Sequence, residues 1–194
     1  GDGGQLTSGM GACSPNYKLT GENEYFLMDN VIYPTLDYLE IEGNPYHGIL
    51  GVNGILTQDG RISILGYQSF MQDCDTMPVL NTIGSDLFDL FESCCLGSFS
   101  DEVADIIYKD LYSSSIVLTC KNKVNKENII SGLDNLDEDT QIIFYPSVNK
   151  NKYLEYEVSE GAVLVVCTKA ATSASAVSKM YEEAISIDYN AKYY

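Results

Sequence analysis

The sequence predicts an α+β fold in which helices pack on antiparallel sheets. Residues 46–56 and 61–67 are apolar runs separated by Gln58-Asp59-Gly60, a pattern typical of a β-hairpin. Apolar side chains recur at helical spacing on both sides of this hairpin and predict helices there. Further short apolar runs in the second half of the chain predict more strands.

The first half is expected to contain two helical segments. Residues 24–42 carry apolar side chains at helical spacing, and Pro34 within them predicts a kink or a break into two shorter helices. Residues 68–77 are polar and predict a loop, after which Pro78 suits the first turn of a helix that continues towards Gly97. The apolar stripe of that helix is Leu80, Ile83, Leu87, Leu90 and Phe91.

The second half is expected to form a unit of strands closed by one helix. Residues 173–186 place apolar side chains on one face, as an amphipathic helix does. Residues 1–11, at the other end of the chain, are rich in glycine and predict a loop. Strands are predicted at 116–119, 141–145, 153–158 and 162–168, with a further short strand at 128–130.

The composition is that of a globular protein with an acidic surface. The chain has 194 residues, 45% hydrophobic and 20% charged, which suits one or two domains with a buried core. The formal charge is −17 and Arg61 is the only arginine. Nucleic-acid binding depends on Lys and Arg that neutralise phosphates, so no nucleic-acid partner is expected. No apolar run reaches the roughly 18 residues of a membrane span, so no membrane contact is expected.

The cysteines and the first residues of the chain bear on its cellular location. An even number of cysteines permits a disulfide framework, but most lie in apolar runs where a reduced core thiol fits better. We therefore expect reduced thiols and a cytoplasmic location. No signal peptide is visible, and Gly1 is not expected to be the translated start: either an upstream segment was removed or the sequence is a piece of a longer chain. The cysteines are Cys13, Cys74, Cys94, Cys95, Cys120 and Cys167.

Two segments resemble motifs of one enzyme family. Residues 7–15 read TSGMGACSP, and residues 61–80 read RISILGYQSFMQDCDTMPVL. Both are similar to motifs of glycinamide ribonucleotide synthetase (phosphoribosylamine–glycine ligase), an ATP-grasp enzyme of purine biosynthesis, which read T-G-G-M-G-A-Y-S-P and K-V-L-E-F-N-C-R-F-G-D-P-E-T-Q-P-I-L. Shorter matches continue the resemblance in the same order, at 32–35, 43–50, 85–87 and 187–194.

The resemblance implies a domain order and an activity. Residues 1–100 are expected to form a domain like the second ATP-grasp lobe, an antiparallel sheet with helices, and residues 101–194 the small mixed α/β C-terminal domain of this family. The implied reaction is ATP-dependent carbon–nitrogen ligation of phosphoribosylamine to glycine, with Mg²⁺ and ATP as cofactors. The N-terminal half of the family has no counterpart in these residues. We therefore expect the lone chain to be inactive unless a protein partner supplies that half.

The glycine-rich start of the chain is the candidate substrate-binding segment. Backbone amides of such a loop can cradle a phosphate or carboxylate group, and the resemblance places substrate here. The alternative is a flexible turn without a ligand. The candidate residues are Asp2, Thr7, Ser8, Gly9, Met10 and Gly11.

The candidate metal site departs from the family pattern. In the family, the Glu and Asn of E-F-N hold the magnesium ions that bridge the ATP phosphates, and Gly66 and Gln68 stand at those positions here. Gly66 offers no side-chain oxygen, whereas the amide oxygen of Gln68 could replace its ligand in part. Asp73 keeps the aspartate of D-P-E-T, and together with Asp75 it is the candidate replacement carboxylate. The alternative is that these aspartates are solvated surface.

Three functions therefore stay open. The chain is expected to be part of a phosphoribosylamine–glycine ligase, or a degenerate relative that serves as a structural or partner-binding subunit, or a protein that binds a nucleotide or small anion without ligation. A protein partner would dock where the hairpin is left uncovered. Side chains expected there are Ile49, Leu50, Ile55 and Ile64.

Overall fold

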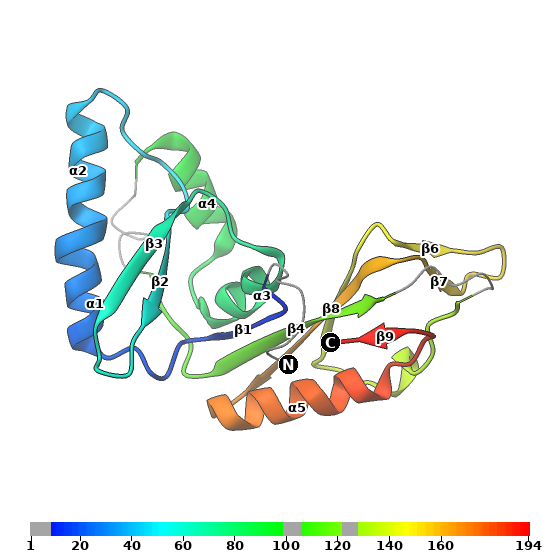
Figure 1. The fold of residues 1–194 in the computed structure, drawn as a ribbon. Helices are drawn as coiled ribbons and strands as arrows, with labels where there is room; N and C mark the ends of the chain where they lie inside the picture. Colours follow the sequence, from blue (N-terminus) through cyan, green and yellow to red (C-terminus); the bar gives the residue numbers. More distant parts are fainter. Residues whose placement is uncertain (1–8, 99–105, 122–127) are drawn as a thin grey trace. The chain divides into compact units, whose positions relative to one another are not determined.

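The computed structural model describes residues 9–98, 106–121 and 128–194, and the chain forms two compact units. The sheet unit comprises residues 1–15, 72–82 and 109–194, and the hairpin unit comprises residues 16–71 and 83–108. The observed mixture of helices and antiparallel sheets confirms the predicted α+β class (Figure 1). The predicted domain boundary near residue 100 stays a prediction, because these units are defined by compactness alone and the sheet unit draws on both halves of the chain.

One antiparallel sheet organises the sheet unit. Its strands lie in the order β1 (Gly11–Ser14), β4 (Tyr112–Cys120), β8 (Gly161–Ala170) and β5 (Gln141–Phe144), and β9 (Lys192–Tyr193) also pairs with β4. The centre of the sheet is the long pairing of β4 with β8, in which Ile116 lies opposite Val166 and Val117 opposite Val165. These central strands are buried almost throughout, as their runs of Val, Ile and Leu predict.

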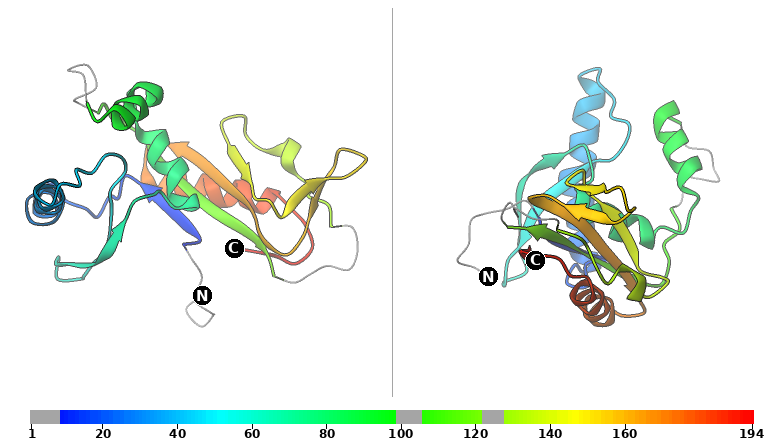
Figure 2. Two further views of the ribbon diagram at one scale, coloured as in Figure 1. Left: turned by 90° about the horizontal axis from the view of Figure 1, so that it is seen from above. Right: turned by 90° about the vertical axis from the view of Figure 1, so that its right-hand side faces the viewer.

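Helices cover the two faces of this sheet. Side chains alternate between faces along a strand, so Ile116 and Val117 of β4 point in opposite directions. Ile116 packs in the main core with Met180 of α5 (Ser173–Ser186), whereas Val117 packs with Cys74 of α3 (Asp73–Thr82). Figures 1 and 2 show α5 lying along one side of the sheet. The sheet is thus the middle layer of a three-layer unit.

Smaller elements complete the sheet unit. The hairpin of β6 (Val148–Lys150) and β7 (Tyr156–Val158) packs Val158 in the main core, and a 3-10 turn, η2, spans Leu133–Asn135. The short strand predicted at 128–130 is reduced to an isolated bridge between Ile129 and Glu157. Asn128, which is buried, instead uses its side chain to bind the backbone of Asn190.

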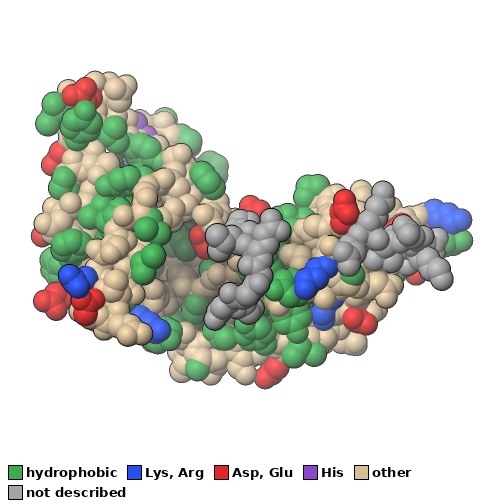
Figure 3. Space-filling view, viewed as in Figure 1, with side chains coloured by type: hydrophobic (Ala, Val, Ile, Leu, Met, Phe, Trp, Pro, Cys, Tyr) green, Lys and Arg blue, Asp and Glu red, His purple; other side chains and the backbone are tan. Residues whose placement is uncertain are grey.

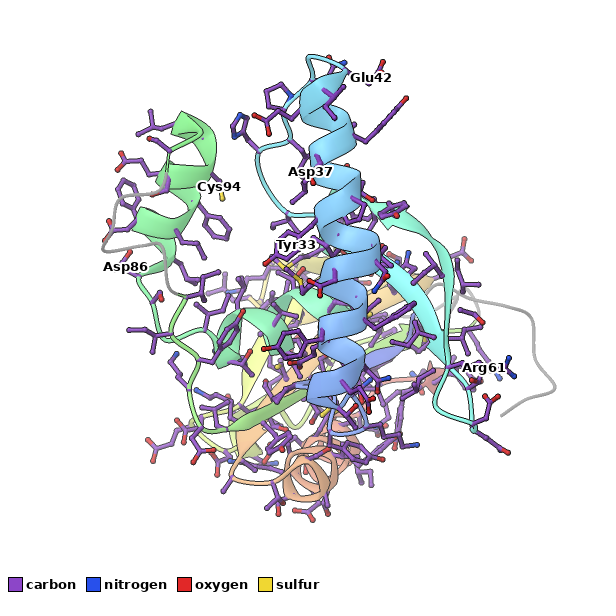
Figure 4. All side chains as sticks on the ribbon, turned by 90° about the vertical axis from the view of Figure 1, so that its left-hand side faces the viewer. Tyr33, Asp37, Glu42, Arg61, Asp86 and Cys94 are labelled. Atoms are coloured by element: carbon purple, nitrogen blue, oxygen red, sulfur yellow. The ribbon has the colours of Figure 1, made fainter. Side chains whose placement is uncertain are left out.

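The hairpin unit contains one interrupted helix, a two-stranded hairpin and a second helix. The interrupted helix consists of α1 (Gly21–Leu27), a π-helical turn η1 (Met28–Ile32) and α2 (Tyr33–Ile41). The hairpin pairs β2 (Gly51–Leu56) with β3 (Ile62–Gln68), and α4 spans Leu87–Leu96. Figure 4 shows Tyr33, Asp37 and Glu42 along α2, Arg61 near the turn of the hairpin, and Asp86 at the start of α4.

The predicted interruption at Pro34 takes the form of a wide turn. Pro34 stands at the start of α2, where the missing N–H of proline is tolerated. The turn before it, η1, widens to π-helical geometry, and the chain continues as a helix on both sides. π-Turns of this kind are usual where the regular hydrogen-bond ladder of an α-helix is interrupted.

The structure corrects the predicted loop at 68–77 and the long helix after it. α3 begins at Asp73, so Pro78 lies inside this helix rather than in its first turn. Pro78 has no N–H to donate to the carbonyl of Cys74 four residues earlier. Ser115 Oγ of β4 donates to that carbonyl instead, so a distant strand stabilises the helix at this point.

α4 is a separate helix because the sequence after α3 supplies a new start. Asp86 caps it, with its carboxylate accepting a hydrogen bond from the backbone N–H of Phe88 at 2.8 Å. Gly97 ends it in the left-handed conformation, with φ of 66°. Among the described residues, no helix is both long and apolar enough to cross a membrane.

Candidate functional site

Part of the candidate substrate-binding segment is built into the sheet. Asp2, Thr7 and Ser8 lie outside the described residues. The carbonyl of Met10 accepts a hydrogen bond from the backbone N–H of Val117 at 2.8 Å, and Gly11 begins β1. A Cβ at Gly11 would lie 2.9 Å from the carbonyl oxygen of Ser115, so the glycine is needed for close strand pairing. At this end of the segment, glycine is therefore explained by packing.

Gly9 lies against the beginning of α3. A Cβ added there would meet Cys74 Sγ at 3.1 Å and Gln72 Oε1 at 3.5 Å. The sheet unit therefore brings Gly9 of the candidate substrate-binding segment next to the neighbours of Asp73, the candidate metal ligand. The sequence separation of the two segments exceeds 60 residues, and only the packing of α3 on β1 and β4 explains their proximity.

The start of α3 is negatively charged. Asp73 and Asp75 occupy its first turn, where carboxylates interact favourably with the helix dipole. Burial, and next the interaction with the Asp73 carboxylate, raises the pKa of Tyr145 to about 12. Burial, and next the charge of Asp75, raises the pKa of the Cys74 thiol to about 11. The two carboxylates disfavour a bound anion here, and the thiol, whose pKa is raised mainly by burial, is protonated at neutral pH.

The other candidate metal position belongs to the hairpin unit. The amide oxygen of Gln68, the last residue of β3, accepts a hydrogen bond from Asn53 Nδ2 at 3.2 Å. Gly66, two residues earlier on the same strand, lies opposite Asn53. The structure thus groups Gln68 with Gly66 and Asn53, whereas Asp73 belongs to the sheet unit.

The residues present do not fit a magnesium site. Mg²⁺ prefers hard oxygen ligands that include one or two carboxylates. Within residues 9–98, 106–121 and 128–194, no group of three or more His, Cys, Asp or Glu side chains could hold a metal ion. Gly66 offers no side chain and Gln68 offers a neutral oxygen that already accepts a hydrogen bond.

Sequence reasoning missed two residues that shape these sites. Tyr145 was predicted only as part of a strand, although it follows the end of β5 and the carboxylate of Asp73 affects its pKa. Asn53 lies within a predicted strand, and its role depends on the register that places it opposite Gly66. A search for polar residues on the two strands of one predicted hairpin would have identified Asn53, whereas no sequence pattern pairs Tyr145 with Asp73.

Comparison with known proteins first defines the class of the fold. A family model described as phosphoribosylglycinamide synthetase, ATP-grasp (A) domain, matches residues 1–76. The chain superposes with a TM-score of 0.62 on the biotin carboxylase domain of Hydrogenobacter thermophilus 2-oxoglutarate carboxylase, a structure in complex with MgADP and bicarbonate. That match has 14% sequence identity and covers 95% of this chain and 40% of the other. The chain has an α+β ATP-grasp-like fold, as predicted.

The particular relatives are phosphoribosylamine–glycine ligases. The chain is 29% identical over 198 residues to the enzyme of Vibrio parahaemolyticus, a match that covers 100% of this chain and 45% of the relative. The crystal structure of the Thermotoga maritima ligase superposes with a TM-score of 0.74 and 23% identity, over 100% of this chain and 47% of that one. The chain is therefore related along its whole length to somewhat less than half of these ligases, and it carries an ATP-grasp domain related to theirs.

Proposed function

We propose that this chain corresponds to the second ATP-grasp lobe and the C-terminal domain of a phosphoribosylamine–glycine ligase-like protein, and that alone it does not catalyse ATP-dependent ligation. The observation that carries the proposal is the loss of metal ligands within a retained framework. The strand and hairpin that carry positions 66 and 68 are intact, yet Gly66 and Gln68 replace the carboxylate and amide of the family motif.

Loss of these metal ligands should prevent or strongly slow catalysis, because phosphoryl transfer from ATP depends on bound metal ions and on positively charged side chains. Magnesium bridges the phosphates and neutralises charge in the transition state, which lowers the barrier by several kcal/mol. Arginine would be the usual substitute for part of this charge. Arg61, the one arginine of the chain, lies near the hairpin turn and pairs with Asp59 at 2.5 Å (Figure 4). Any binding of Mg²⁺ and ATP by this chain should therefore be weak.

The ligase assay tests the proposal directly. Purified chain, phosphoribosylamine, glycine and Mg-ATP are combined, and ADP is measured by a coupled assay with a phosphoribosylamine–glycine ligase as the positive control. We expect no ADP that depends on both substrates. Release of ADP that requires both phosphoribosylamine and glycine would refute the inactivity of the lone chain.

The second candidate function is that of a structural or partner-binding subunit, favoured by the small core of the hairpin unit. Among its described residues, the large apolar side chains that are buried are Val31 and Leu90. Figure 3 shows apolar side chains exposed over α2 and the hairpin. Contiguous exposed apolar surface usually marks an interface. The exposed residues include Tyr25, Phe26, Tyr38, Ile41, Ile55, Leu65, Tyr67 and Phe88.

The proposed partner is a polypeptide that supplies what the matched ligases have outside the aligned 45% of their length. The charge of −17 opposes self-association at low salt, so a different polypeptide is favoured over a second copy. None of the six cysteines, all of which lie in the described residues, forms a disulfide, and this supports the proposed cytoplasmic location. Light scattering of the pure chain and affinity purification from its source test the partner. A monomer from which no partner is recovered would contradict the subunit role.

A further inference from the structure

The face of the β2–β3 hairpin that carries Gly66 and Gln68 is a small, well-defined surface. Residues two apart on a strand share a face, and the register places Asn53 opposite Gly66 and Gly51 opposite Gln68. Tyr67, between them, points to the other face, where its hydroxyl lies 3.0 Å from Thr35 Oγ1 of α2. We define Gly51, Asn53, Gly66 and Gln68 as the amide face.

Two amide side chains are joined across the amide face. Asn53 Nδ2 donates to Gln68 Oε1 at 3.2 Å. The aliphatic part of Gln68 lies over Gly51, where an added Cβ would come within 2.7 Å of Gln68 Cγ. Gly51 is thus required for this side-chain position, and Gln68 is directed towards Asn53.

The fourth position, Gly66, has open space where a side chain would stand. A Cβ added there would meet nothing within 4 Å, and its φ is not in the positive range that favours glycine. Glycine inside a strand weakens it, and usually marks a bulge or a close approach of another group. The register passes from Asn53 opposite Gly66 to Gly54 opposite Ile64, so Leu65 is the extra residue of a bulge on β3 and Gly66 lies next to it. The space above Gly66 is nevertheless open, because no atom lies within 4 Å of the added Cβ. The structure therefore has room for a side chain beside the two amides.

We infer that the amide face is a vacated divalent-cation site: the native chain binds no divalent cation there, and one carboxylate at position 66 would create a site with Asn53 and Gln68 as additional ligands. Directly opposed strand residues have Cβ atoms about 5 Å apart, so a glutamate side chain at position 66 reaches Asn53. The two amides provide further oxygens of the hard type that Mg²⁺ and Mn²⁺ accept. This inference extends the proposed function by adding Asn53, but cation binding is measurable whether or not any ligase activity exists.

The test compares Mn²⁺ binding by electron paramagnetic resonance, without nucleotide, in the native chain and in Gly66→Glu. We expect binding in the millimolar range or weaker for the native chain and at least tenfold tighter binding for Gly66→Glu. Leu65→Glu is the matched control, because it adds the same charge at a neighbouring position that is 67% exposed. Adding Asn53→Ala to Gly66→Glu should reduce the gained affinity.

Two results would overturn the inference. If Gly66→Glu binds Mn²⁺ no more tightly than Leu65→Glu, the amide face is not a vacated site. If the native chain binds Mn²⁺ well below millimolar concentration and Gln68→Ala abolishes that binding, the site is occupied in the native protein. Circular dichroism checks folding, with Gly66→Gln as the neutral variant of similar size, and Gly66→Asp replaces Gly66→Glu if the longer side chain prevents folding.

Discussion

At the scale of single residues, buried polar side chains with defined hydrogen-bond partners contribute more to holding this fold together than exposed charged side chains do. Asn128 is 1% exposed, and its amide accepts from the backbone N–H of Asn190 at 2.7 Å and donates to the carbonyl of Asn190 at 3.1 Å. The sequence could not predict this pair, because Asn128 was expected only within a short strand and its partner lies near the C-terminus. By contrast, the Gly66 and Gln68 substitutions were visible in the motif itself.

Asn128→Ala should lower the free energy of unfolding by about 1–3 kcal/mol, because it removes a buried amide that makes two hydrogen bonds to the backbone of Asn190. Urea unfolding followed by circular dichroism measures this. Asn149→Ala, at an exposed position on β6, is the control and should change stability by less than about 0.5 kcal/mol. Equal effects of the two substitutions would contradict a structural role for the Asn128 amide.

The burial of Tyr145 and its interaction with Asp73 predict a pH dependence of stability in the alkaline range. Burial and the carboxylate raise the pKa of Tyr145 from 10.0 to about 12, so the folded state favours the protonated phenol. This contribution to stability is complete below pH 10 and is lost as the pH rises towards 12. Tyr145→Phe should cost about 1 kcal/mol at neutral pH, and the cost should shrink between pH 10 and 12. A cost that does not change over this range would contradict the assignment.

At the scale of elements, prediction succeeded where local pattern and final structure agree. The last helix spans 173–186 as predicted, because its apolar stripe is long and Thr172 caps its start by accepting from Ser175 N at 3.1 Å. The predicted loop before Pro78 was wrong because a side chain of β4, Ser115, stabilises the carbonyl that proline leaves unpaired. Such long-range compensation has no local pattern in the sequence.

Gly132 tests how tightly one turn packs on the end of α5. Its φ is +83°, and an added Cβ would lie 1.9 Å from the carbonyl oxygen of Ser186. Gly132→Ala should therefore destabilise the chain by about 3 kcal/mol or more, from strain and steric overlap together. Gly161→Ala is the control with positive φ but open space, and should cost about 1–2 kcal/mol. Thermal unfolding of both variants measures the difference in stability. Equal losses of stability would contradict the account, because they would show that the backbone at Ser186 can move to accommodate the added methyl group.

At the scale of the whole molecule, the fold class and the relationship to ATP-grasp ligases were both predictable from the sequence. The relationship rests on collinear short motifs, and the comparisons confirm it over the full chain. The candidate site was predictable only in part. Met10 and Gly11 are used in strand pairing, and the metal candidates Gln68 and Asp73 belong to different compact units. Which residues share a face or a unit depends on register and on packing, which motif order does not specify.

Calorimetric titration with Mg-ATP tests the central claim most directly, because it measures nucleotide binding without requiring either ligase substrate. With Gly66 and Gln68 at the ligand positions, we predict a dissociation constant on the order of millimolar or weaker, equivalent to about 4 kcal/mol of binding free energy. A micromolar dissociation constant that rises when magnesium is removed would contradict the account, because it would show that this chain keeps a working metal–nucleotide site.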